Sequence, residues 1–118
     1  MSNYTVEFFE KENGEVPVEK FIYSLGNKLE AKFYRLLDML AKNGPDLREP
    51  YSKYINDGIF ELRPRVGNDI ARALYFFYDG KRIIVTNGFI KKTQKTPIKE
   101  IEIAKKYRNE YLRREEKK

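Results

Sequence analysis

The stretch that decides the fold spans residues 59–91 and reads IFELRPRVGNDIARALYFFYDGKRIIVTNGFIK. It contains three apolar runs, which predict consecutive strands at 59–65, about 70–78 and 82 to about 91. Residues 66–69 connect the first two runs. Asp79-Gly80 separates the second and third, and this dipeptide favours a hairpin because both residues tolerate the positive φ angles of a tight turn. We therefore expect an antiparallel meander at the centre of the protein.

The residues before the meander predict one more strand and two helices. Residues 4–9 alternate as a half-buried strand does, and a polar turn follows at 10–15. Pro17 suits the first turn of a short amphipathic helix that ends at Gly26. A second helix is expected from Asn27, as its N-cap, to Asn43-Gly44-Pro45. Residues 46–57 show no period and are expected to form a loop. The apolar stripe of the second helix consists of Leu29, Phe33, Leu36, Leu37 and Leu40.

A third helix is predicted after Thr96-Pro97, followed by a frayed charged tail at 113–118. This order of elements gives an α+β fold, with an antiparallel β-sheet, two N-terminal helices packed on one face and a C-terminal helix. We expect a single domain over residues 1–118, with the other face of the sheet open to solvent. The third helix is expected to direct toward the core Ile98, Ile101, Ala104, Tyr107 and Tyr111.

The composition excludes several kinds of chemistry. The 118 residues include 24 Lys+Arg and 18 Asp+Glu, for a net charge of +6, but no Cys and no His. Disulfides, a thiol nucleophile and the Ser-His-Asp triad are therefore excluded, as are the usual zinc sites. Acid–base chemistry must use Glu, Asp, Lys, Tyr or Arg, and no metal or other cofactor is expected. Because neither a signal peptide nor a membrane-spanning apolar run is evident, we expect a cytoplasmic protein without membrane contact.

Cations on the predicted sheet are the first candidates for a binding site. Strand alternation places Glu61, Arg63 and Arg65 on one face, toward solvent or a ligand. Pro64 cannot donate to a ladder, so this strand is expected to end, bulge or lie near an edge there. Arg72 is the one cation in an apolar strand and needs an anionic partner or a route to solvent. Beside Arg63 it would hold a phosphate with two guanidinium groups, but the pattern does not fix that register.

A basic loop at 91–97 joins the third strand to the last helix. Lys91, Lys92 and Lys95 lie in this loop, just before a helix N-terminus that favours anions. Together with the strand arginines they predict a phosphate-binding cleft. Each feature also has a simpler interpretation, because charged strands and lysine loops are ordinary solvated surface, and Arg72 can serve a structural ion pair.

Three segments carry a resemblance to a known family. They are GIFELR at 58–63, RALYFF at 72–77 and GFIKKTQKTP at 88–97, supported by Glu100, Ala104 and Tyr107. The sequence resembles the HigB toxins of bacterial type II toxin-antitoxin systems, in the phage-derived Gp49-like branch of the RelE/ParE superfamily. The FxKKTxKTP stretch is the most specific part, since hydrophobic periodicity does not require it.

The resemblance implies a ribosome-dependent mRNA endoribonuclease with a RelE-like fold. In such enzymes the ribose 2′-OH attacks the adjacent phosphate without metal, giving a cyclic phosphate and a free 5′-OH. Carried over by position, Arg63 and Arg72 match the arginines that grip the scissile phosphate, and Lys92, with Lys91 beside it, matches the basic residue after the last strand. The implied partners are a HigA-like helix-turn-helix antitoxin, the ribosomal decoding site and mRNA, with operator DNA reached only through the antitoxin.

The general base is left open by the sequence. Glu61 is the first candidate, since alternation places it with Arg63, and Lys91 or Lys92 with a lowered pKa is the second. Glu61 is equally a candidate structural partner for Arg63 or Arg72. Two other functions stay open: a ParE-like inhibitor of DNA gyrase without nuclease activity, and an inactive partner of the antitoxin. Candidate RNA-binding residues, including possible base-stacking tyrosines, are Arg65, Lys95, Tyr51, Lys53, Tyr54 and Tyr75.

Overall fold

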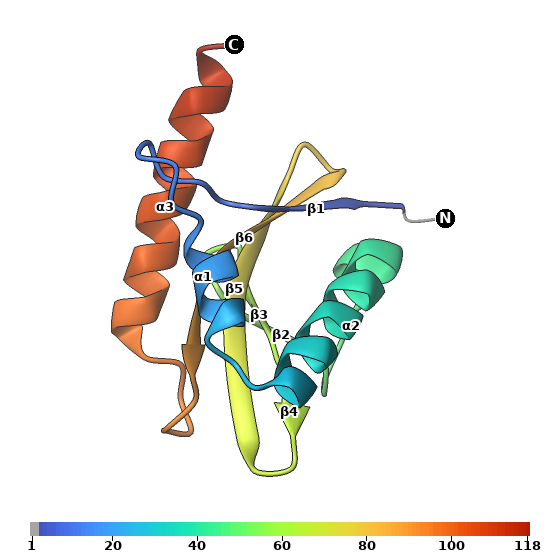
Figure 1. Ribbon diagram of the computed structural model, residues 1–118. Helices are drawn as coiled ribbons and strands as arrows, with labels where there is room; N and C mark the ends of the chain where they lie inside the picture. Colours follow the sequence, from blue (N-terminus) through green and yellow to red (C-terminus); the bar gives the residue numbers. More distant parts are fainter. Residues whose placement is uncertain (1–2) are drawn as a thin grey trace.

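The computed structural model describes residues 3–118 and has the mixed α+β architecture that the sequence predicts (Figure 1). One strand and two α-helices come first, five strands follow in the middle of the chain, and a long helix comes last. The elements are β1 (Thr5–Phe8), α1 (Pro17–Tyr23), α2 (Asn27–Asn43), the 3₁₀ helix η1 (Gly44–Asp46), β2 (Ser52–Asn56), β3 (Ile59–Leu62), β4 (Arg65–Val66), β5 (Asp69–Tyr78), β6 (Arg82–Ile90) and α3 (Ile98–Glu116).

The strands form one six-stranded sheet in the order β1-β6-β5-β3-β2, with β4 paired to β5. The expected antiparallel meander is confirmed, because β3 pairs antiparallel with β5 and β5 with β6. The prediction of a fully antiparallel sheet is wrong at β1, which is parallel to β6 with Val6 opposite Ile83. Parallel pairing needs a long connection, and here the two helices and the other strands lie between the partners.

The prediction of a loop at 46–57 is wrong at Ser52–Asn56. These residues form the edge strand β2, which pairs antiparallel with β3. Asp57 and Gly58, with φ of 50° and 77°, make the turn between these strands. Asp79 and Gly80 have nearly the same angles, 52° and 77°, between β5 and β6. Both hairpins therefore use the positive-φ conformation that the Asp-Gly dipeptide tolerates.

The apolar stripe expected on α2 is confirmed, since all five of its residues are buried. The expected cap is wrong: Gly26 occupies the N-cap position, no side chain caps this end, and Asn27 is the first helical residue. α1 buries Val18 and Ile22 beside this stripe. The two helices together cover one face of the sheet, over Leu62, Ala73, Tyr75, Ile83 and Val85.

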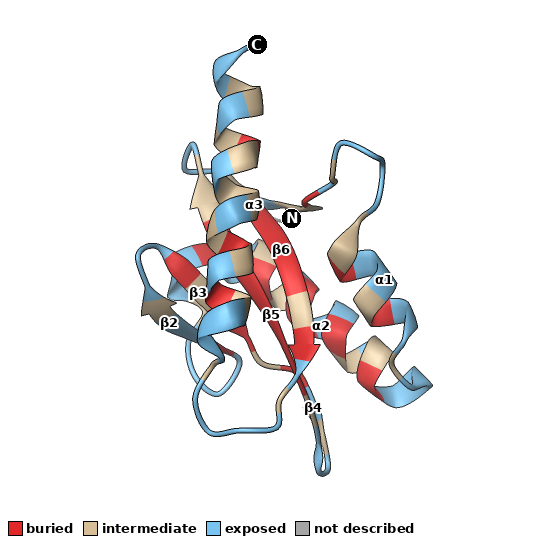
Figure 2. Ribbon diagram, turned by 90° about the vertical axis from the view of Figure 1, so that its left-hand side faces the viewer, coloured by how far each residue is buried: buried red, intermediate tan, exposed pale blue. Residues whose placement is uncertain are grey.

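The opposite face of the sheet, expected to be open, is covered by α3. Figure 2 shows the buried residues of β5 and β6 between α3 and the α1–α2 pair. Leu74, Phe76 and Ile84 pack against Ile101 and other residues of α3 in a second core. The central strands are apolar on both faces, so both faces must be covered from water.

The helix α3 continues to Glu116, so the frayed tail expected at 113–118 is wrong for most of its length. Glu115 forms an ion pair with Arg82 at 2.8 Å, and Arg114 donates to the carbonyl of Glu10 at 2.5 Å. Ile98, expected in the core, is 74% exposed, whereas Ile101, Ala104 and Tyr111 are buried as expected. No helix within residues 3–118 is long and apolar enough to cross a membrane.

Candidate functional site

Four cations from three segments line one pocket of about 460 Å³. They are Arg63 after β3, Arg72 in β5, and Lys91 and Lys92 after β6, and Ile70, Thr93 and Gln94 complete the wall. The strands β3, β5 and β6 are neighbours in the sheet. Four residues of the predicted phosphate-binding cleft therefore lie together, whereas Lys95 lies outside this pocket. We call this the basic pocket.

The end of β3 at Leu62 sets the position of the arginines. Pro64 offers no N–H, and beyond Leu62 the backbone N–H of Arg63 donates to the carbonyl of Tyr51 at 2.9 Å. Leu62 lies opposite Ala73, so the next residues along the two strands, Arg63 and Arg72, are adjacent. This pairing resolves the register that the sequence pattern left open.

Arg72 is a buried cation with one unsatisfied donor. The residue is 6% exposed, and its Nη1 donates to the carbonyl of Ala71 at 2.9 Å, while its Nε has no hydrogen-bond acceptor within residues 3–118. Burial, and then the nearby charge of Arg63, lowers the pKa of Arg72 from its ordinary value. A guanidinium stays protonated in proteins, so a positive charge is retained at low exposure beside the pocket.

Glu61 is the anion that faces both arginines. Its side chain is 1% exposed, and its Oε1 lies 3.3 Å from Nε of Arg72 and 3.6 Å from Nε of Arg63. Thr96 donates to its Oε2 at 2.5 Å. Both carboxylate oxygens are thus engaged, and the contact to Thr96 ties the loop at 91–97 to β3. Arg63 also contacts Glu49, which is 60% exposed, at 3.4 Å.

Lys91 stands at the junction of the pocket walls. Its backbone N–H donates to the carbonyl of Ile70 at 2.9 Å, which fixes the chain where β6 ends. Desolvation, followed by the charge of Arg72, lowers the pKa of the half-buried Lys91 ammonium from its ordinary value, despite the opposing effect of Glu61. The ammonium group of Lys91 therefore loses its proton more readily than that of a lysine in water.

Two neighbouring pockets hold the other expected binding residues. One, of about 610 Å³, shares Arg63 and Arg72 with the basic pocket and also contains Tyr51 and Arg65. The other, of about 260 Å³, shares Arg63 and Lys91 and also contains Lys53, Tyr54 and Lys95.

Tyr75 does not reach these pockets, so its prediction as a base-stacking residue is wrong. It is 1% exposed in the core under α1 and α2, and its hydroxyl is hydrogen-bonded to Ser52. Burial raises the pKa of Tyr75 to about 12. The sequence could not decide this, because both faces of β5 are apolar.

Sequence reasoning missed Lys32 of α2, which lines the larger neighbouring pocket. The signal was present, because Lys32 comes three residues after buried Leu29 and four before buried Leu36. It therefore lies on the edge of the buried face of α2.

The first turn of α3 contains one carboxylate of the protein itself, that of Glu100. Asn87 donates to the Glu100 side chain at 3.1 Å and to its carbonyl at 3.2 Å. The expected contribution of this helix N-terminus to anion binding is therefore shared with Glu100.

The fold and the basic pocket define a class of small α+β proteins with a cationic pocket where the strands of the sheet end. The fold is similar to that of a chain in the crystal structure of the archaeal RelE–RelB complex from Pyrococcus horikoshii OT3, with a TM-score of 0.50. The identity is 21%, and the match covers 75% of this chain and 94% of that chain. No curated protein matches this chain.

The model of the family "Phage derived protein Gp49-like (DUF891)" matches residues 20–109. The chain therefore belongs to the Gp49-like family, which confirms the branch that the sequence predicts. The match includes every residue of the basic pocket.

Proposed function

We propose that this protein is a HigB-like toxin of a type II toxin-antitoxin system and acts as a ribosome-dependent, metal-independent mRNA endoribonuclease. The observation that carries the proposal is the basic pocket, where four cations surround a space of about 460 Å³ beside a single buried carboxylate. This excess of positive charge suits an RNA phosphate. Membership of the Gp49-like family and the fold shared with the RelE–RelB structure support it.

In the proposed reaction the ribose 2′-oxygen attacks the adjacent phosphorus and the bond to the 5′-oxygen breaks. The products are a 2′,3′-cyclic phosphate and a free 5′-OH. Arg63 and Arg72 stabilise the negative charge that develops on the phosphate oxygens, since forked guanidinium donors match that geometry. The proton of the 2′-OH goes to a base, and the 5′-oxygen receives a proton from an acid.

We assign the base to Lys91 and the acid to Lys92. The lowered pKa of Lys91 makes its neutral amine more available than that of an ordinary lysine, and it lines the basic pocket. Lys92 is exposed at the rim of the same pocket. Glu61 is less suited to accept the proton, because it is 1% exposed and both its oxygens are engaged. Its role is to position the two arginines.

The proposed partners are mRNA in the ribosomal decoding site and a HigA-like helix-turn-helix antitoxin, through which operator DNA is reached. A net charge of +6 favours association with ribosomal RNA, and it equally favours an acidic antitoxin segment. The similar archaeal structure is itself a complex of RelE with RelB, which supports a partner of this kind.

The test is primer extension on a reporter mRNA in a cell-free translation reaction. We expect the wild-type protein to cleave within the translated frame only while translation proceeds. Lys92→Ala should lower cleavage at least tenfold, whereas Lys99→Ala should not, because Lys99 is exposed on α3 outside the basic pocket. Removing Lys92 leaves no buried group unpaired, so folding is preserved.

Intact mRNA in the presence of folded wild-type protein would overturn the proposal. A supercoiling assay with DNA gyrase would then examine the alternative, a ParE-like inhibitor. Cleavage that continues when translation is blocked would overturn the ribosome dependence.

A further inference from the structure

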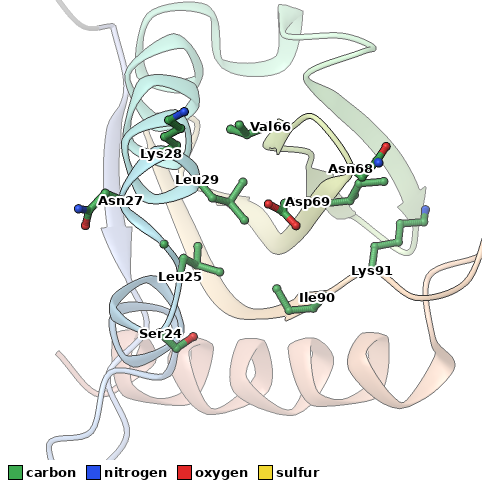
Figure 3. A pocket seen from close by; sticks show the side chains of 12 residues that line it. Ser24, Leu25, Asn27, Lys28, Leu29, Val66, Asn68, Asp69, Ile90 and Lys91 are labelled. Carbon is green, nitrogen blue, oxygen red and sulfur yellow. The ribbon is translucent and has the colours of Figure 1, made fainter.

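A second pocket, of about 530 Å³, adjoins the basic pocket. The two share Ile70 and Lys91 in their walls. Three segments meet there: the α1–α2 junction at 24–29, the β4–β5 hairpin and the end of β6. Its volume lies within the range of small-molecule sites, roughly 300–1,000 Å³. We call it the junction pocket (Figure 3).

The walls of the junction pocket are mixed, with an apolar part beside polar residues that include Lys28 and Lys91. Leu25 and Leu29 contribute from the helices, Val66 from β4, and Ile90 from β6. Ile90 is 46% exposed, so β6 ends in an apolar side chain that no part of residues 3–118 covers fully. The apolar part suits a flat, weakly polar group that gains from leaving water.

One carboxylate, that of Asp69, stands in this pocket. Figure 3 shows it directed toward Leu29, while the Lys91 side chain points away to the other side. Within residues 3–118 the Asp69 side chain has no ion pair and no hydrogen bond. A carboxylate only accepts hydrogen bonds, so its natural ligand carries N–H or O–H donors. Asp69 is exposed, and the junction pocket holds this carboxylate beside two lysines, whereas within residues 3–118 the basic pocket is lined by four cations and no carboxylate.

The order of these groups matches the order of groups in a nucleotide. The four cations of the basic pocket suit a phosphate, and the apolar side chains of the junction pocket with the acceptor Asp69 suit a nucleobase. Guanine is the base that presents two adjacent donors, N1–H and the 2-amino group, to one carboxylate. Uracil presents a single ring N–H between two carbonyl oxygens, which Asp69 would repel. Unpaired RNA bases are commonly read through this edge.

We propose that the junction pocket binds the guanine base of a nucleotide whose phosphate lies in the basic pocket, with Asp69 accepting from the pairing edge of the base. This inference rests on the proposed function, because it treats the occupant of the basic pocket as RNA. It makes Asp69 a specificity residue that contacts the base and takes no part in bond cleavage.

Binding is tested by NMR titration of the ¹⁵N-labelled full chain with the 5′- and 3′-monophosphates of guanosine and uridine. We expect guanosine monophosphate to shift the amide signals of Leu25, Asp69 and Ile90, and uridine monophosphate to bind about tenfold more weakly. Asp69→Asn should abolish this difference. Asp38→Asn should retain it, because Asp38 is exposed on α2 outside the junction pocket.

Equal affinity for the two bases, or shifts that leave all three amides unchanged, would overturn the proposal. The same variants are then compared in the translated-reporter reaction. We expect Asp69→Asn to cleave with less preference for positions next to guanosine, and Asp38→Asn to keep the wild-type distribution of sites. An unchanged distribution of sites would overturn the guanine pocket while the nuclease assignment stands. Loss of cleavage in wild type would instead overturn the nuclease assignment, leaving the titration to decide on base binding.

Discussion

At the scale of single residues, the arrangement of the two arginines depends on Glu61. It is the carboxylate that contacts both Arg63 and Arg72, and it is almost fully buried. Glu49 also contacts Arg63 but is 60% exposed. The two glutamates therefore allow a matched comparison of ion pairs with arginine, because Glu61 is buried and Glu49 is exposed to solvent.

Glu61→Ala should lower the free energy of unfolding by about 3 kcal/mol, because it leaves the buried Arg72 charge uncompensated. Glu49→Ala should cost less than about 1 kcal/mol, as is usual for an exposed pair. Urea unfolding of both variants checks this difference. Equal midpoints would mean that Glu61 does not hold the arginines.

Lys91 gives a prediction about pH. Since its pKa is lowered in the folded protein, the folded state binds fewer protons than the unfolded state between that pKa and the ordinary value of 10.5. The contribution of Lys91 to stability therefore increases as pH rises through this window. A ¹³C NMR titration of the Lys91 side chain should give a midpoint below 10.5.

Arg72→Gln removes a positive charge that lowers the pKa of Lys91, so the midpoint should move up toward the ordinary value. Removal of Arg65 provides the control, since Arg65 is not among the groups that shift the pKa of Lys91. A midpoint that does not move in Arg72→Gln would show that the charge of Arg72 does not lower the pKa of Lys91.

The sequence identifies Arg63, Arg72, Lys91 and Lys92 as a group because their residue types and strand ends are visible in it. It does not reveal that Glu61 pairs with both arginines, since that depends on register and burial. It also misplaces Tyr75, because the strand is apolar at both alternating positions and local pattern carries no information about which face meets which helix.

At the scale of elements, β2 shows why a strand can escape prediction. It lies at the edge of the sheet with one neighbour, and three of its five residues are exposed, so no apolar alternation marks it. The turn after it did carry a signal, since Asp57-Gly58 repeats the dipeptide of the hairpin at Asp79-Gly80. The helices were easier to predict, because the apolar stripe that α2 buries recurs at helical spacing within one continuous segment of the sequence.

Gly88 permits the close approach of α1 to β6. A Cβ atom at this position would overlap the ring of Phe21. Gly88→Ala should therefore destabilise the protein by about 1–3 kcal/mol through overpacking. Phe21→Leu shortens the opposing side chain, so the double variant should lose less stability than the two single changes together. Thermal unfolding of the four proteins measures the coupling, and strict additivity would contradict this contact.

At the scale of the whole molecule, helices cover both faces of the sheet, and the functional residues are left where strands β3, β5 and β6 end. The sequence located these residues but placed them on an open sheet face. The error arose because α3 was not assigned to a face, and contacts between elements distant in sequence have no local signature.

The charge of the whole protein predicts a strong salt dependence of RNA binding. For a short single-stranded RNA, the slope of log affinity against log salt should be about −0.7 for each phosphate neutralised. Lys92→Ala should reduce the slope by about 0.7, while Lys99→Ala should leave it close to that of wild type. Fluorescence anisotropy at several salt concentrations measures this slope for each protein. Identical slopes for wild type and Lys92→Ala would exclude Lys92 from phosphate contact.

The parallel pairing of β1 with β6 has a consequence for the synthesis of the chain. Thr5–Phe8 leave the ribosome well before their partners in the sheet, Arg82–Val85. The sheet therefore cannot close on its nascent chain until β6 has emerged, and contacts of this sequence separation form slowly. The loop with Lys91 and Lys92 comes later still. A ribosome making this protein thus completes all six strands of the sheet before the basic pocket exists.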